Sequence, residues 1–319
     1  MNAKHWLGAC ATMLLATAAP RVASGHPADE LQPGHWMELS LNTIEDIDPC
    51  PERDCSYSAQ EGLYGAINDW CGGVLASGFG ALGGLVVYGG GHQGYYGSEL
   101  YVFDIDSQLW ERYTQPYDNG AGSVAGECNA DGVYPDGSPC PPHTYDRVEY
   151  DPVTNAFVLL FSTTDPVCGG CDSPNAHRFD FDRDSWSLGG THPEPPSGTG
   201  AASAYDPNRN AVWLLPAYNG QFSRYDLATD TWSTHGAYNI SIDVVAAIDP
   251  GRDLFVAVEG RETGTVIAFD LAQGTADGVT LDVAGAGGTA VWTLIPPDGD
   301  WATETGQGLR VDAARDNPV

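Results

Sequence analysis

The stretch FDFDRDSW (residues 179–186) decides the fold, because the same pattern recurs along the chain. FDIDSQLW (103–110) and YDLATDTW (225–232) share its order of an aromatic residue, Asp, an apolar residue, a short polar turn and Trp. A further copy, FDLAQGTA (269–276), keeps the first half of the pattern and lacks the tryptophan. Such recurrence is the signature of a protein built from structural repeats.

A second pattern precedes the first one in each later unit. It reads YDPVTNAFVLL from residue 150, YDPNRNAVWLL from residue 205 and IDPGRDLFVAV from residue 248, and SGFGALGGLVVY from residue 77 takes its place in the first unit. Proline fixes φ and Asx side chains bond the nearby backbone, so these patterns predict tight turns between strands. The later units recur about every 43–46 residues. Four short strands at that period predict an all-β propeller of four-stranded blades, with each Trp between neighbouring blades.

The first unit carries a resemblance to a known class of repeat. Its paired glycines at 83–84 and 89–91, the strand ELYVFD (99–104) and the closing Trp110 resemble kelch-type repeats of the galactose-oxidase-like propellers. The resemblance covers roughly residues 70–283 and implies a kelch-type β-propeller over residues 70–319. It implies a fold only, because propellers host many unrelated activities.

The repeat alone does not fix the number of blades. Four units are recognisable, and the chain from residue 285 is too short and acidic for an ordinary fifth blade. HWMELSLNT (35–43) resembles a lone outer strand that would complete a last blade with GGTAVWTLIPP (287–297). We therefore expect about five blades, the last one irregular or completed by this N-terminal strand. An open, incomplete ring is the alternative.

The amino terminus predicts export. Residues 1–24 combine a positive Lys4, an apolar run at 6–18 and small residues at 22–24, which is typical of a signal peptide. LGAC (7–10) resembles a lipoprotein box, but little apolar sequence precedes it. We expect a secreted or periplasmic protein without membrane insertion, since no segment is long and apolar enough to span a bilayer. Residues 25–69 are expected to form an N-terminal segment with a local disulfide.

Seven cysteines follow the signal peptide. In an exported chain, cysteines that are close in sequence predict local disulfides that staple loops. The close pairs are Cys50 with Cys55, Cys128 with Cys140, and Cys168 with Cys171. The last pair, CGGC, has a redox site as its alternative. Cys71 is left over and is expected to be a buried thiol or to pair with a distant cysteine.

The charge restricts the partners. The formal net charge is −30, and Lys4 is the only lysine. The mature protein therefore has no lysine for a Schiff base or a phosphate-binding loop. An acidic surface repels nucleic acid and anionic membranes. The expected partner is an extracellular glycan or protein, and the chain is expected to be a monomer.

Four residues are candidates for catalysis. His92 follows the glycine run at the end of an apolar strand, where propeller loops gather near the axis and often make the binding site. His143, Tyr145 and Arg147 alternate in PPHTYDRVEY, so an extended backbone places them on one face. The alternative is that both histidines hydrogen-bond the backbone in loop turns.

Two functions from different classes fit these residues. The first is a non-catalytic exported propeller that binds a glycan or protein through its loop face. The second is a polysaccharide lyase, because some secreted lyases are propellers that use His, Tyr and Arg. Elimination at a uronic acid needs a cation on the carboxylate, a base and an acid. His92, His143, Tyr145 and Arg147 would form that site, with ligand contacts from Tyr95, Tyr96, Arg178 and Arg224.

No cofactor is expected. A copper-radical oxidase needs two histidines and two tyrosines on the metal, and no histidine follows His235. DFDRDS (180–185) begins like a calcium loop but lacks the glycine and the distant glutamate. NADGVYPDGS (129–138), between Cys128 and Cys140, has the composition to bind calcium or to cover the propeller mouth. The alternative for this stretch is an ordinary solvated loop.

Overall fold

The computed structural model divides the chain into two units, residues 1–39 and 40–319. It describes residues 26–27, 31–32, 35–59, 61–68, 71–90, 94–120, 122–160, 173–193, 200–217, 220–238, 244–259, 266–272 and 281–283. All the described strands belong to the second unit. The described helices are single turns: η2 (Glu45–Ile47), η3 (Gly62–Tyr64) and α1 (Gly65–Asn68). No helix in the described ranges is long and apolar enough to cross a bilayer.

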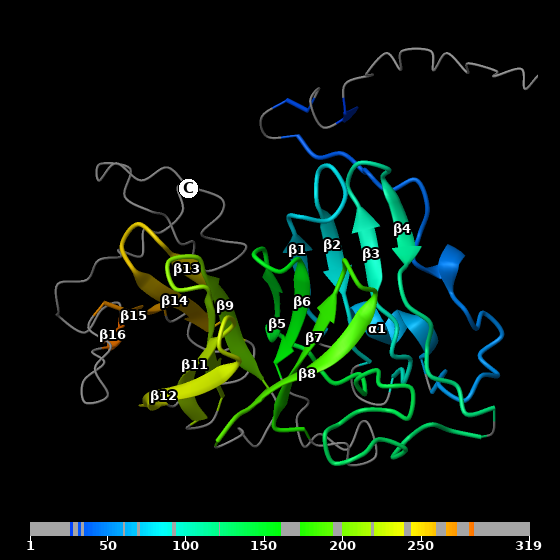
Figure 1. The fold of residues 1–319 in the computed structure, drawn as a ribbon. Coiled ribbons are helices and arrows are strands. Elements are labelled where there is room, and N and C mark those ends of the chain that lie inside the picture. Colours follow the sequence, from blue (N-terminus) through cyan, green and yellow to red (C-terminus); the bar gives the residue numbers. More distant parts are fainter. Residues whose placement is uncertain are drawn as a thin grey trace, which may run out of the picture. The chain divides into compact units, whose positions relative to one another are not determined.

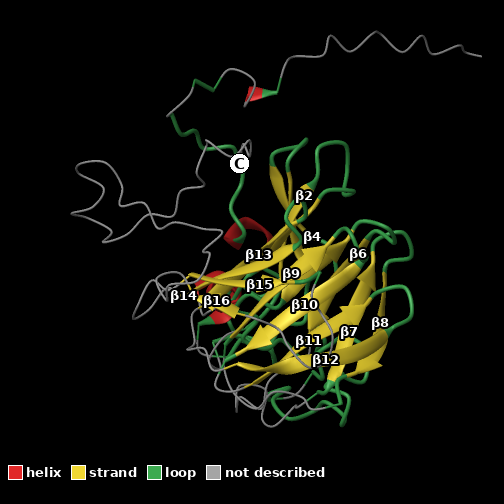
Figure 2. Ribbon diagram, turned by 90° about the vertical axis from the view of Figure 1, so that its left-hand side faces the viewer, coloured by secondary structure: helices red, strands yellow, loops and turns green. Residues whose placement is uncertain are grey.

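Four antiparallel sheets, each of four strands consecutive in sequence, make up the second unit (Figures 1 and 2). The first blade contains β1 (Gly73–Ala76), β2 (Gly84–Val87), β3 (Tyr101–Asp104) and β4 (Leu109–Arg112). The second contains β5 (Val148–Asp151), β6 (Ala156–Leu160), β7 (Asn175–Asp180) and β8 (Ser185–Thr191). The third contains β9 (Ala201–Asp206), β10 (Ala211–Pro216), β11 (Gly220–Asp226) and β12 (Thr231–Tyr238). The fourth contains β13 (Val244–Asp249), β14 (Leu254–Glu259), β15 (Val266–Asp270) and β16 (Leu281–Val283).

The aspartates of both sequence patterns close the hairpins. In the second blade, Asp151 Oδ1 accepts the backbone N–H of Val153 at 2.9 Å, and the turn ends at Asn155 with a positive φ of 51°. Asn and Asp tolerate this left-handed conformation better than other non-glycine residues. Other hairpin turns repeat the same Oδ1 contact at Asp104, Asp180, Asp206, Asp226, Asp249 and Asp270.

The second strand of a blade shows why the blades pack face to face. On β6, Phe157 and Leu159 belong to a buried cluster shared with the first blade, whereas Val158 and Leu160 belong to one shared with the third. Successive side chains of a strand point to opposite faces, so a continuous apolar strand buries both faces. The first strands of successive blades, β1, β5, β9 and β13, also contact one another. This arrangement confirms the predicted all-β propeller of four-stranded blades.

The repeated tryptophans contact the preceding blade, as expected. Trp186 packs on Tyr88 of the first blade, with ring centroids 5.4 Å apart. Trp232 donates from Nε1 to the carbonyl oxygen of Gly190 in the second blade at 2.9 Å. Both residues lie near the start of the outer strand of their blade.

The expected fifth blade falls outside the described residues, because residues 284–319 are not described. The same holds for the pairing of residues 35–43 with 287–297. Leu41 and Asn42 of that N-terminal stretch contact the first blade. Leu41 donates its backbone N–H to Gln108 O at 2.8 Å, and the Asn42 amide bonds both backbone groups of Trp110 at 2.7 and 3.0 Å.

The predicted local disulfide in residues 25–69 is present: Cys50 and Cys55 are bonded, with their Cα atoms 6.1 Å apart. Cys128 and Cys140 are both disulfide-bonded. Cys168 and Cys171 lie outside the described residues. Cys71 is a half-buried thiol whose Sγ lies 3.6 Å from the carbonyl oxygen of Gly65.

Candidate functional site

Three of the four predicted catalytic residues lie together in the segment directly before β5. The rings of His143 and Tyr145 meet edge to face with centroids 5.5 Å apart. Arg147 places its guanidinium carbon 5.9 Å from the centroid of the Tyr145 ring. The three side chains are neighbours, but the backbone that joins them is not extended as the alternating pattern predicts: it turns, with the Arg147 backbone N–H donating to Thr144 O at 2.9 Å. His92 lies outside the described residues, so a cleft shared by His92 and His143 stays a prediction.

Burial limits what this cluster can contact. His143 is 0% exposed and Arg147 is 1% exposed. The Arg147 guanidinium donates to the backbone oxygen atoms of His143 and Thr144. A cation enclosed in this way presents no surface to a substrate carboxylate. Tyr145 is partly exposed and has a positive φ of 46°.

The two tyrosines proposed for ligand contact have structural partners. Tyr95 is 1% exposed, and its hydroxyl donates to Glu99 Oε1 at 2.5 Å. Tyr101 donates to the same oxygen at 3.1 Å. Burial raises the pKa of Glu99 to about 7. Tyr96 is half-buried and donates its backbone N–H to Tyr57 O at 2.9 Å.

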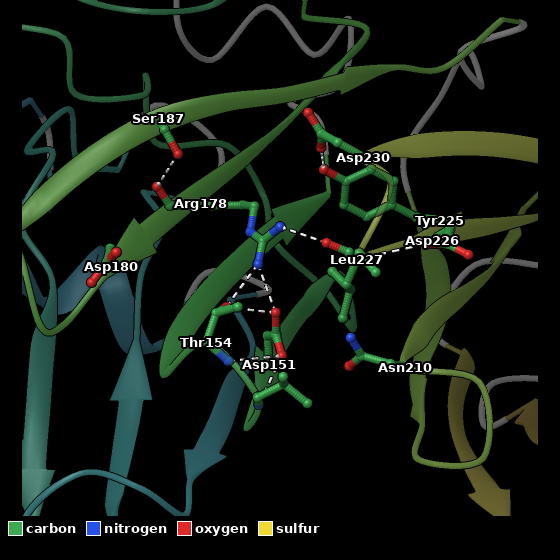
Figure 3. A network of polar contacts seen from close by, with 12 residues as sticks. Asp151, Thr154, Arg178, Asp180, Ser187, Asn210, Tyr225, Asp226, Leu227 and Asp230 are labelled. Atoms are coloured by element: carbon green, nitrogen blue, oxygen red, sulfur yellow. Dashed lines mark hydrogen bonds and ion pairs between the residues drawn. The ribbon is translucent and has the colours of Figure 1, made fainter.

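The two arginines expected at the ligand are engaged in ion pairs. Arg178 lies 2.6 Å from Asp151 Oδ2, donates to Thr154 Oγ1 at 2.8 Å and reaches Leu227 O of the third blade at 3.0 Å (Figure 3). It therefore joins the second blade to the third. Arg224 lies 3.7 Å from Asp226.

An equivalent clamp joins the next two blades. Arg209 pairs with Asp206 at 2.9 Å within the third blade and donates to Asp253 Oδ2 of the fourth at 2.6 Å. It also donates to the carbonyl oxygen of Leu271 at 3.1 Å. Leu271 and Leu227 take the same place in the repeat, directly after the Asp of the third strand. Arg178 and Arg209 thus serve the packing of blades.

A buried acid cluster lies where three blades meet. Ser203 Oγ on β9 is 2.7 Å from both the backbone oxygen of Asp146 and Glu149 Oε1 on β5. Asp146 Oδ2 accepts the backbone N–H of Ala246 on β13 at 2.7 Å. Burial raises the pKa of Glu149 to about 8 and that of Asp146 to about 6.

Two hollows lie between the long loop after the first blade and the outer strand of the second. Their volumes are about 440 and 310 Å³, and Gly137 and Trp186 line both. We call them together the Trp186 groove. The larger hollow is lined by residues that include Glu127, Tyr134, His177, Ser187 and Leu188, and the smaller one by residues that include Thr114, Asp136 and Asp184.

Aromatic rings hold both walls of the groove. Trp186 packs against Phe179 with ring centroids 5.2 Å apart, and Tyr134 stacks on Tyr117 at 5.0 Å. Gly137 closes the turn of the loop with a positive φ of 91°. The sequence pattern assigned Trp186 to blade packing only and did not predict this groove. The available signal was the stretch 129–138, which was proposed to cover the propeller mouth.

No family model matches the chain, and neither does any curated protein. The class to which the chain belongs is therefore defined by its fold: it is a β-propeller with a ligand-sized groove between its first two blades.

Proposed function

We propose that the protein is an exported β-propeller that binds a glycan in the Trp186 groove. The proposal rests on the groove itself, which is lined by the aromatic side chains of Trp186 and Tyr134 and by polar groups such as Glu127. Binding sites for small ligands combine apolar or aromatic walls with a few polar groups, in hollows of about 300–1,000 Å³. A sugar ring has the matching chemistry, because its C–H faces pack on aromatic rings and its hydroxyls hydrogen-bond to carboxylates.

The same residues favour binding over elimination. A lyase must neutralise a uronate carboxylate with a cation. No arginine or lysine is among the described residues that line the two hollows, and Glu127, Asp136 and Asp184 would repel an anionic sugar. Arg147, the cation expected in the lyase site, is buried and bonded to backbone oxygens.

Filling the groove is expected to weaken binding strongly. Ser187 is exposed on β8 and lines the larger hollow, so Ser187→Arg places a bulky side chain where the ligand would lie. Affinity for the glycans found in a binding screen should fall at least about tenfold, as expected from loss of roughly 1.4 kcal/mol or more of contact energy. Isothermal titration calorimetry measures this change.

Ser233→Arg is the matched control. Ser233 follows Trp232 as Ser187 follows Trp186, but it belongs to the third blade and lines neither hollow. It should leave affinity unchanged. Equal affinity of the Ser187→Arg variant and the wild type would place the ligand elsewhere.

A further inference from the structure

The Trp186 groove opens where the repeat is interrupted. In the third blade, Trp232 donates from Nε1 to the backbone oxygen of Gly190, four residues after Trp186. The corresponding residue of the first blade is Thr114, four residues after Trp110. There the outer strand β4 has already ended at Arg112, and Thr114 lines the smaller hollow.

Trp186 is consequently left with an unused donor. Its Nε1 is buried and has no hydrogen-bond partner among the described residues. A buried N–H without a partner is costly, so its presence in a native fold calls for an explanation. The comparison with the third blade explains the unpaired N–H: a ligand oxygen in the adjoining hollow would take the place of the missing strand carbonyl.

The charge around the groove is of one sign. Glu127 lines the larger hollow, and Asp136 and Asp184 line the smaller one. His177, the one histidine among the described lining residues, stays neutral because burial lowers its pKa to about 4. None of the three carboxylates forms an ion pair with another described residue.

Hydrogen bonds from neighbouring residues orient two of these carboxylates. Glu127 accepts hydrogen bonds from the Tyr117 hydroxyl at 2.9 Å and from the Asn119 amide at 2.7 Å. Asp136 Oδ1 accepts from the hydroxyl and the backbone N–H of Ser138 at 2.7 and 3.0 Å. The groove thus combines fixed negative charge with an aromatic wall, and both attract a cationic ligand.

We propose that the Trp186 groove selects glycans with free amino groups, of the glucosamine type, whose ammonium groups pair with Glu127, Asp136 and Asp184. This inference rests on the proposed glycan binding and names the class of sugar. A hydroxyl or ring oxygen of the same sugar accepts the hydrogen bond from Trp186 Nε1. Uronates and sulfated sugars are excluded by charge.

A pair of oligosaccharides that differ only in acetylation tests the selection. The probes are β-1,4-linked hexamers of glucosamine and of N-acetylglucosamine, titrated calorimetrically into the full chain at about pH 5.5, where amines are protonated. The glucosamine hexamer should bind about tenfold more tightly, because several exposed ion pairs each contribute modestly. Raising sodium chloride from about 50 to about 500 mM should remove most of this difference.

Neutralising the smaller hollow provides the structural test. The double variant Asp136→Asn, Asp184→Asn keeps the turn acceptor of Asp136 and suits the positive φ of 49° at residue 184. It should lose most of the preference for the glucosamine hexamer, and the part that remains comes from Glu127 in the larger hollow. The control Asp106→Asn, Glu111→Gln removes the same charge from exposed residues that line neither hollow, and it should keep the preference.

The outcomes separate this inference from the proposed function. If the acetylated hexamer binds as tightly as the free amine at low salt, the groove is a glycan site without amine selection, and only the inference fails. If other glycans bind and neither hexamer does, the inference again fails alone. If no glycan of any class binds, both fail.

Discussion

Replacing Glu149 by glutamine is expected to stabilise the protein above pH 7 and to remove much of the pH dependence of its thermal unfolding. Glu149 is buried on β5, and burial raises the pKa of its carboxyl from 4.5 to about 8, with a further increase from the charge of Asp146. The wild type therefore folds with a protonated carboxyl at a pH where the unfolded chain has released that proton.

The direction of the effect follows from proton binding. The stabilisation from Glu149 is fully present below about pH 4.5, decreases as the pH rises and is lost above about pH 8. One unit of pKa corresponds to about 1.4 kcal/mol, so the full change is roughly 5 kcal/mol. Glutamine has no proton to release, and the variant therefore avoids this loss.

The hydrogen bonds around Glu149 agree with a neutral side chain. Ser203 Oγ lies 2.7 Å from two oxygens, the backbone carbonyl of Asp146 and Glu149 Oε1. The single hydroxyl proton of Ser203 serves only one of these contacts, and a carbonyl oxygen only accepts. A proton on Glu149 completes the second hydrogen bond. The amide of glutamine offers a donor and an acceptor in nearly the same shape.

Thermal unfolding at about pH 5, 6.5 and 8 measures the effect. The gain in melting temperature should be small at pH 5 and reach about 10 °C or more at pH 8 for a domain of this size. Asp146 and Glu99, with pKa values of about 6 and 7, lower the stability of both proteins as the pH rises. His177, with a pKa of about 4, raises the stability of both proteins as the pH rises. The control Glu111→Gln alters an exposed side chain and should show no pH-dependent gain. A gain that stays constant with pH would contradict the assignment to Glu149.

The strands were predictable because their signals are local. Asp151 starts a turn through a bond to Val153, and the apolar run 156–160 alternates between two faces. The turn and the apolar run both depend on residues close in sequence, so the sequence pattern predicts them directly. The contact of Trp186 with Tyr88 follows from the repeat as soon as blades are stacked.

The candidate site was not predictable in the same way. The sequence placed His143, Tyr145 and Arg147 on one side of the chain, but alternation does not tell which side other blades cover, and Arg147 proved to be buried. The groove forms because β4 of the first blade ends before it reaches Trp186 of the second blade. The sequence of one blade does not show this. Besides the composition of the stretch 129–138, the sequence signal was spacing, because the chain from Trp110 to β5 is longer than the corresponding connections in the later blades.

The largest loss of stability from a single side chain is expected for Arg178→Met. Asp151 is 0% exposed, and its ion pair with Arg178 lies in the contact between the second and third blades. Methionine preserves most of the packing volume but leaves a buried carboxylate whose remaining hydrogen bonds within the described residues come from Thr154 and Val153. Removing one partner of a buried pair costs about 3–5 kcal/mol, because the remaining charge is not compensated.

An exposed pair in the same blade gives the control. Arg183 pairs with Asp180 but is 79% exposed, so Arg183→Met should change the melting temperature very little. Arg178→Met should lower it by about 6 °C or more. The double variant Arg178→Met, Asp151→Asn removes the buried charge while keeping a turn acceptor, and it should recover part of the loss. Equal melting temperatures for Arg178→Met and Arg183→Met would show that this ion pair does not hold the blades together.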